Sequence, residues 1–211
     1  MPEFNEDVKI EKSGSPKLSI RSRGSGTQHY SIRVTNSKDA AGGRNFIIRN
    51  EDSGKDVLMI DKTGNIQVLG DIRLPGADCA EDFDISGSGE LGPGTVMIIG
   101  DEGKLHESRD AYDKRVAGVI SGGGDYRPGI ILGRRQSQDS RLPLALAGKV
   151  SCKVDARYSP IAVGDLLTTS STPGHAMKAD NPHSSYGAVI GKALRPLAGG
   201  CGSIPVLIAL H

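Results

Sequence analysis

Apolar residues alternate with polar ones in five short runs of the first 74 residues. The runs are KLSIRS (17–22), HYSIRVT (29–35), RNFIIRN (44–50), KDVLMID (55–61) and NIQVLGDI (65–72). A period of two is typical of β-strands with one buried face. Thr63, Gly64 and Asn65 lie between the last two runs, where a glycine supplies the positive φ of a tight turn. The pattern therefore predicts a series of antiparallel β-hairpins.

These predicted strands offer little apolar bulk, because residues 1–74 contain only two Phe and one Tyr. At about 25 cal/mol per Å² of buried apolar surface, so thin a sheet barely offsets the entropy lost on folding. Two interpretations follow from this shortage. In the first, three identical chains share the missing core in a trimeric stalk. In the second, the region is a monomeric β-domain.

The second half of the chain contains an internal repeat. LGPGTVMIIGDEGK from Leu91 resembles IAVGDLLTTSSTPGH from Ile161, and VAGVIS from Val116 resembles YGAVIG from Tyr186. A proline-led apolar run follows in each copy. The predicted alignment pairs Gly94 with Gly164, Val96 with Leu166, Gly103 with Gly174, Val119 with Val189, Ile120 with Ile190, and Pro143 with Pro205. Each copy reads as short strands joined by glycine turns, which predicts a pseudo-repeated β-barrel or β-clip.

The composition favours an all-β fold. With 29 Gly, 11 Pro and no Trp in 211 residues, the chain is typical of many short strands joined by tight turns. We expect a β-hairpin stalk or attachment region at 1–74 and an acidic junction and linker at 75–90. A β-rich head then occupies 91–211, with its two repeats at about 91–148 and 161–210.

Charge and cysteine usage narrow the function classes. The formal charge of +1 provides no field for nucleic acid or an anionic membrane, and no apolar run is long enough to span a bilayer. The three cysteines, Cys79, Cys152 and Cys201, are far apart and odd in number, so we expect reduced, buried thiols. MPEFNEDVKIEK at the N-terminus lacks the features of a secretory signal, so we expect synthesis in the cytoplasm.

The clearest candidate for chemistry is GADCAEDFD, residues 76–84, which holds four carboxylates. Two carboxyl groups crowded in a partly apolar place take different pKa values and act as an acid and a base. Asp78, Glu81 and Asp82 share a face on a helical turn, whereas Asp82 and Asp84 share a face on a strand. An acidic turn or a helix N-terminal cap accounts for the same residues.

A second cluster, Arg134, Arg135 and Arg141, is either a solvated loop or a weak contact for an anion or polysaccharide. The five histidines are scattered and form no H-x-x-x-H pattern, so no metal site is expected. Neither a phosphate-binding glycine loop nor G-x-S-x-G occurs, and we expect no cofactor.

Several segments taken together resemble a known family. They are LGDIRLPGADCAEDFD, GTVMII, KRVAGVIS, GIILG, LPLALAGKVSCKV and GDLLTTSSTPGHAMKA. They resemble the C-terminal self-cleaving intramolecular chaperone domain of phage neck appendages and tail fibres, a glutamic-type peptidase family. The resemblance covers about residues 70–211, and VLMIDKTGNIQVLGDI resembles the repeating hairpin of trimeric phage fibres. It implies a homotrimer, and in some members the domain cuts its own chain just upstream.

The family's Ala-Asp-x-Ala-Glu segment matches Ala77, Asp78, Ala80 and Glu81 here, with Cys79 where an aromatic residue often stands. The resemblance implies Asp78 and Glu81 as the catalytic acids, with Asp82 in reserve. In the alternative, the domain has kept the fold of the family and lost the self-cleavage activity. Asp78, Glu81 and Asp82 then bind backbone amides or pair with Arg73 or Lys114 at a subunit junction.

Three functions follow as alternatives. The first is a homotrimeric structural and binding component of a phage tail fibre, appendage or phage-like injection particle, exposed on the outside of that particle. Its N-terminal region docks on a tail, baseplate or particle protein, and its head contacts a cell-surface glycan. The second is an autoproteolytic peptidase and intramolecular chaperone that cuts its own chain near residues 70–80. The third is a carbohydrate-binding or adaptor module.

Overall fold

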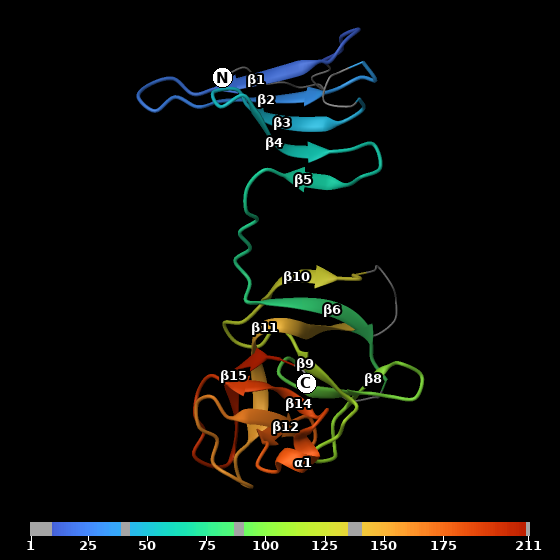
Figure 1. The fold of residues 1–211 in the computed structure, drawn as a ribbon, viewed down its shortest axis with the longest axis vertical. Coiled ribbons are helices and arrows are strands. Elements are labelled where there is room, and N and C mark those ends of the chain that lie inside the picture. Colours follow the sequence, from blue (N-terminus) through green and yellow to red (C-terminus); the bar gives the residue numbers. More distant parts are fainter. Residues whose placement is uncertain (1–9, 39–42, 87–90, 135–140, 210–211) are drawn as a thin grey trace, which may run out of the picture. The chain divides into compact units, whose positions relative to one another are not determined.

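The computed structural model describes residues 10–38, 43–86, 91–134 and 141–209. The chain divides into two compact units, Met1–Arg73 and Leu74–His211. Both are built of short strands, and the predicted all-β class is confirmed (Figure 1). None of the described segments is a helix of sufficient length and apolar character to traverse a bilayer.

The N-terminal unit contains one five-stranded antiparallel sheet in which the strands lie in sequence order. They are β1 (Lys17–Arg21), β2 (His29–Val34), β3 (Phe46–Asn50), β4 (Lys55–Ile60) and β5 (Ile66–Val68). Each of the five alternating runs is therefore a strand. The predicted hairpin between the last two is confirmed, because Ile60 pairs with Ile66 and Gly64 in the turn has a φ of +90°.

The alternation gives this sheet two chemically different faces. One row across all five strands contains, in order, Leu18, Ile32, Ile48, Leu58 and Val68. The opposite face carries ion pairs, in which Arg49 Nη1 lies 2.8 Å and Arg33 Nη2 lies 3.3 Å from the Asp56 carboxylate. Ile47 lies on that charged face and is fully buried. Charged side chains thus pair with one another on one face, while the other face is apolar.

The C-terminal unit contains a β-barrel. Its fifteen-residue strand β11 (Arg141–Asp155) pairs first with β6 (Asp78–Asp84) and β9 (Val116–Ile120), and then with β15 (Cys201–Ile208). The remaining elements are β7 (Val96–Ile99), β8 (Leu105–Glu107), β10 (Pro128–Leu132), β12 (Leu166–Thr169), β13 (Ala176–Lys178), α1 (Pro182–Ser185) and β14 (Val189–Ala193). The sheet order is β13-β12-β14-β15-β11-β9-β7-β8, and β13 also pairs with β11, which closes a ring of strands.

The strand pairings of this unit occur twice along the chain. β7 pairs with β8 and β9, and β9 pairs with the first half of β11. In the same way β12 pairs with β13 and β14, and β14 pairs with β15. The pairing of β6 with the first half of β11 matches that of the second half of β11 with β15. We call residues 78–146 repeat 1 and residues 147–208 repeat 2.

Turn glycines align the starts of the two repeats. Gly94 and Gly164 have φ values of +85° and +88° before β7 and β12, a left-handed conformation that glycine adopts without strain. Gly94 N donates to Ile120 O, and Gly164 N donates to Ala193 O, each at 2.8 Å. Ile120 therefore corresponds to Ala193, and its predicted alignment with Ile190 is wrong.

The predicted alignment of β9 with β14 is wrong by three residues along its whole length. Each strand contains one glycine beside a bulge, Gly118 in β9 and Gly191 in β14. These glycines are equivalent, which places Val119 on Lys192 instead of Val189. Short runs of Val, Ile and Ala can be aligned with each other in several registers. The correct alignment of the two strands therefore follows from their pairing partners and not from residue type.

The apolar cores of the two repeats occupy equivalent positions. Repeat 1 is centred on Met97, Leu105, Ile120 and Leu144, with Phe83 packed against them. Their equivalents in repeat 2 are Leu167, Ala176, Ala193, Val206 and Cys152, which belong to a larger cluster that also contains Val96 and Val119 of repeat 1. The predicted equivalence of the two proline-led strands is confirmed, since Pro143 O accepts from Ser121 N and Pro205 O accepts from Leu194 N.

All three cysteines are free thiols, as expected, but they are not all buried. Cys152 is buried, and desolvation raises the pKa of its thiol to about 12. Cys79 is half-buried and Cys201 is exposed, so the expected burial is wrong for these two.

Candidate functional site

The acidic stretch forms a strand with partners on both edges. β6 pairs antiparallel with β11 and parallel with β10. Gly76 permits this arrangement, because a Cβ on it would lie 2.1 Å from the backbone nitrogen of Gly129, just inside β10. The expected acidic turn or helix cap is therefore wrong. The backbone hydrogen bonds of this stretch are made to two strands that lie far away in sequence.

Burial alternates along β6, with Asp78, Ala80 and Asp82 buried on one face. The Ser121 hydroxyl donates to Asp78 Oδ1 at 3.0 Å, while Oδ2 is buried without a hydrogen-bond partner among the described residues. Desolvation raises the pKa of Asp78 above its ordinary value, and the hydrogen bond from Ser121 acts in the opposite direction. Asp78 is a buried carboxyl group held by one neutral donor.

Two arginines from the predicted basic cluster form ion pairs with the carboxylates at the C-terminal end of β6. Arg134 Nε lies 3.4 Å from Asp82 Oδ2. Arg141, directly across from Asp84 in β11, lies 3.1 Å from the Asp84 carboxylate and also donates to the Asp82 carbonyl. Arg135 lies outside the described residues. Within the described ranges, the ion partners of the β6 carboxylates in one chain are thus Arg134 and Arg141. The pairing with Arg73 or Lys114 at a subunit junction stays a prediction.

Glu81 lies on the other face of β6, because residues three apart on a strand project to opposite sides. It is half-buried and pairs with Leu144, a member of the core of repeat 1. Its equivalent in repeat 2 is Val150, which is fully buried and pairs with Val206. Asp78 and Glu81 therefore do not face each other within one chain.

Asp78 and Asp82 share a face but lie four residues apart. At about 3.3 Å per residue, their backbones are separated by roughly 13 Å, which is too far for one proton to be shared. Ser121 is also buried, so its hydroxyl is closed to a substrate. No three His, Cys, Asp or Glu side chains within the described ranges come together in a way that could hold a metal ion.

The arrangement is thus a row of carboxylates on β6 whose partners are one serine and two arginines, while Asp78 Oδ2 and Asp82 Oδ1 are buried without a hydrogen-bond partner among the described residues. Sequence reasoning identified both the acidic and the basic cluster but missed that they meet. The sequence contains only a weak signal that the two clusters meet. Arg141 begins an apolar run, which predicts that Arg141 lies on a strand, but the run does not indicate which strand pairs with it. Comparisons of the chain with protein-family models, curated proteins and solved structures found no match.

Proposed function

We propose that this chain is a structural subunit of a phage tail fibre, neck appendage or phage-like injection particle, and that it assembles as a homotrimer. The observation that carries the proposal is the apolar face of the β1–β5 sheet. Large side chains on this face are exposed by 38% to 64%, namely Leu18, Ile20, Val34, Phe46, Ile66 and Val68. Contiguous exposed apolar surface of this kind marks an interaction site.

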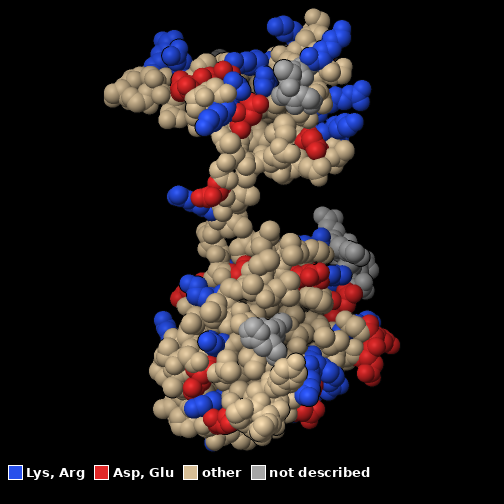
Figure 2. Space-filling view, in the orientation of Figure 1, with Lys and Arg blue, Asp and Glu red and all other residues tan. Residues whose placement is uncertain are grey.

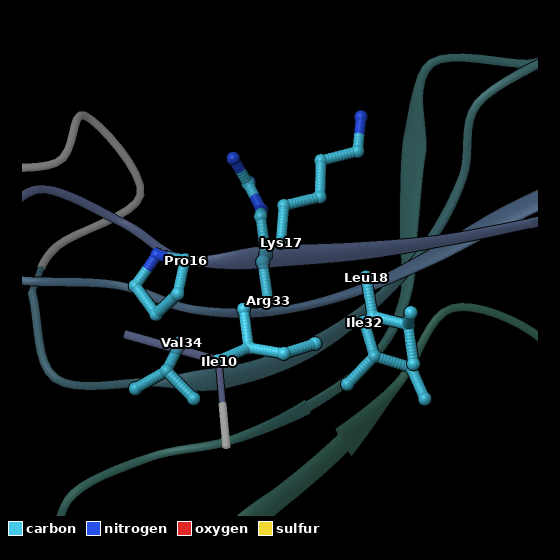
Figure 3. Close-up of a pocket in the computed structure, with 7 residues that line it drawn as sticks. All are labelled: Ile10, Pro16, Lys17, Leu18, Ile32, Arg33 and Val34. Carbon is cyan, nitrogen blue, oxygen red and sulfur yellow. The ribbon is translucent and has the colours of Figure 1, made fainter. Parts of the chain in front are cut away.

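The face is also hollowed at its β1–β2 end. A cavity of about 220 Å³ is lined by Ile10, Pro16, Lys17, Leu18, Ile32, Arg33 and Val34. In Figure 3, the charged ends of Lys17 and Arg33 point away from the side on which the apolar side chains lie. An apolar hollow on an exposed sheet favours contact with another apolar surface over contact with water.

Identical chains are the partners that this sheet fits best. Its charged face is neutralised internally, with Lys17 Nζ 2.5 Å from Glu51 and Arg49 Nη1 2.8 Å from Asp56. A single-layer sheet whose apolar face is open to water gains little of the free energy that burial of that face would supply. Three copies that bring their apolar faces together supply one another with the missing core.

In this proposal, residues 1–74 form the stalk or attachment region and dock on a tail, baseplate or particle protein. The double-repeat unit forms the head, and three identical heads compensate by avidity for weak single contacts to a cell-surface glycan. The mature subunit is then exposed on the outside of a virion or phage-like particle.

The test is the mass of the full chain, measured both native and denatured. We expect a denatured mass of 22.1 kDa and a native mass three times larger. Ile66→Arg, on the apolar face, is expected to lower the native mass. Ile72→Arg is the matched control, because Ile72 is similarly exposed (67% against 64%) but follows β5 and lies outside the sheet.

A native mass of one chain at micromolar concentration would refute the proposal. Two fragments in the wild type that become one chain in Glu81→Ala would replace it with self-cleavage near residues 70–80. Equal effects of Ile66→Arg and Ile72→Arg would remove the apolar face as the basis of assembly.

A further inference from the structure

The two repeats contact each other through surfaces that are not equivalent. The turn at residues 170–175 of repeat 2 inserts its Gly174 between β7 and the end of β8 in repeat 1. Val96 N donates to Gly174 O at 2.9 Å, and Gly174 N donates to Ser108 O at 2.8 Å. We call this turn the docked turn, and Val96 with Ser108 the occupied socket. Both socket residues are fully buried.

A second contact lies beside the first. Tyr112 N donates to Thr169 O at 3.2 Å, and Asp113 N donates to Thr169 Oγ1 at 2.7 Å. Here the segment before β9 of repeat 1 packs on the end of β12 of repeat 2. Thr169 is fully buried as a result. Each repeat thus contributes a different part of its surface to one interface.

Repeat 2 carries an open copy of the socket. Leu166 corresponds to Val96 and Ala179 corresponds to Ser108, since Ala179 N donates to Leu166 O as Ser108 N donates to Val96 O. Leu166 is 41% exposed, whereas Val96 is fully buried. Leu166 and Ala179 instead line a cavity of about 330 Å³ together with residues of α1 and Tyr186. We call Leu166 and Ala179 the open socket.

Repeat 1 carries an open copy of the docked turn, at residues 100–104. Gly103 corresponds to Gly174, and both are in the left-handed region, with φ values of +74° and +66°. A Cβ on Gly174 would lie 2.8 Å from the Thr95 side chain, but a Cβ on Gly103 would meet no atom within 4 Å. We call residues 100–104 the open turn.

The second contact has an open copy as well. Ile99, in the position of Thr169, is 49% exposed. Tyr186 stands three residues before β14, as Asp113 stands three before β9, and it is 85% exposed. Two large apolar side chains are therefore exposed at the two positions whose equivalents meet inside the chain.

We infer that the open turn and Ile99 of one copy dock on the open socket and Tyr186 of a second copy, in the same way as the two repeats of one chain dock on each other. The occupant of the 330 Å³ cavity is thus a second copy of this chain. The inference rests on the repeat and does not depend on the proposed fibre function.

Local charge is compatible with this occupant. The open turn contains Asp101, Glu102 and Lys104, of which Lys104 Nζ lies 3.8 Å from Glu102, and Figure 2 shows acidic side chains gathered on the surface beside β8. Next to the open socket, Lys192 is exposed and pairs across the sheet with Leu166. The neighbouring Lys178 is already paired with Asp165 at 3.2 Å and Asp180 at 3.6 Å. Lys192 therefore offers a cation beside the open socket to the carboxylates of the open turn.

The predicted interface is head-to-tail, because one copy presents repeat 1 and the other presents repeat 2. Such an interface produces a closed ring if its rotation closes, and a filament if it does not. In either case the same pair of residues, Ile99 and Tyr186, meets at every junction between copies.

A disulfide tests this junction directly. Chains carrying Ile99→Cys and chains carrying Tyr186→Cys are unfolded in urea, mixed, refolded together and oxidised. The 2.7 Å contact between the equivalent Asp113 and Thr169 brings their backbones within the range of a disulfide. We expect a disulfide-linked species of two chains on a non-reducing gel, and its loss when Leu166→Arg is added to the Tyr186→Cys chain.

The matched control replaces Ile99→Cys with Leu132→Cys, since Leu132 is exposed to a similar degree as Ile99 (44% against 49%) but lies on β10. The wild-type chain, with its three native thiols, gives the background. Linked species no more abundant than in this control overturn the inference. An oligomer that forms through the β1–β5 face without the cross-link overturns it as well and leaves the proposed function intact.

Discussion

The interface between the repeats makes a quantitative prediction for two equivalent glycines. Gly174→Ala and Gly103→Ala place the same methyl group at the same point of two equivalent turns. Both residues have φ values near +70°, so each substitution carries the left-handed penalty of an L-residue, about 1 kcal/mol. This shared cost cancels when the two variants are compared. The difference between them reports the surroundings of the methyl group alone.

The surroundings differ sharply. On Gly174 the new Cβ would lie 2.8 Å from Thr95 Cγ2 and 2.9 Å from Glu107 Oε1, whereas on Gly103 it would meet nothing within 4 Å. The Glu107 carboxylate can rotate aside, but Thr95 is buried and cannot. Overpacking of this kind costs about 1–3 kcal/mol. We therefore expect Gly174→Ala to lose about 3 kcal/mol of unfolding free energy and Gly103→Ala about 1 kcal/mol.

The assay is urea unfolding of the full chain at concentrations where its native mass is that of one chain. Dilution keeps Gly103 out of the proposed junction between copies, so that both variants are compared as single chains. The two variants should share one slope against urea and differ in midpoint. Losses that agree within about 0.5 kcal/mol would refute the docking of Gly174 in the occupied socket.

Three further predictions concern carboxylates. Asp155 is buried, and hydrogen bonds from Arg157, the closest at 2.6 Å, hold its pKa below 3.8. This stabilisation exists above the ordinary pKa and is lost as the pH falls below it, so in urea unfolding Asp155→Asn should cost about 2 kcal/mol at neutral pH and less near pH 3. Ser121→Ala removes the donor to Asp78 and should raise the pKa of that carboxyl group further, which NMR titration would show. Glu81→Val copies the equivalent residue of repeat 2 and should raise the midpoint of urea unfolding; an unchanged or lower midpoint would contradict the equivalence.

Most strand positions could be predicted from the sequence. The five runs of residues 17–72 became five strands because a period of two is a property of neighbouring residues. The turn at Gly64 was predictable for the same reason, since the positive φ there depends on a single residue. In the repeats, Gly94 and Gly164 aligned correctly because a glycine with positive φ has few substitutes.

The candidate site was predictable as a list of residues and not as an arrangement. GADCAEDFD lacks a clear alternation of apolar residues, so it suggested a turn, although its partners β10 and β11 make it a strand. The arginines that pair with it, Arg134 and Arg141, lie more than 50 residues further along the chain. Only the register of β6 on β11 brings Arg141 opposite Asp84. Glu81 projects away from Asp78 because the segment is a strand and the two residues are three apart.

The sequence by itself determined the all-β class, the positions of most strands and the existence of a repeat, because alternation and turn glycines act within a few residues. The tertiary structure alone decided the register of β9 against β14 and the partners of the β6 carboxylates. It also decided which copy of each repeat surface is buried. These depend on pairings between distant segments, where several registers of Val, Ile and Ala satisfy the local pattern equally well and only the packed barrel selects one.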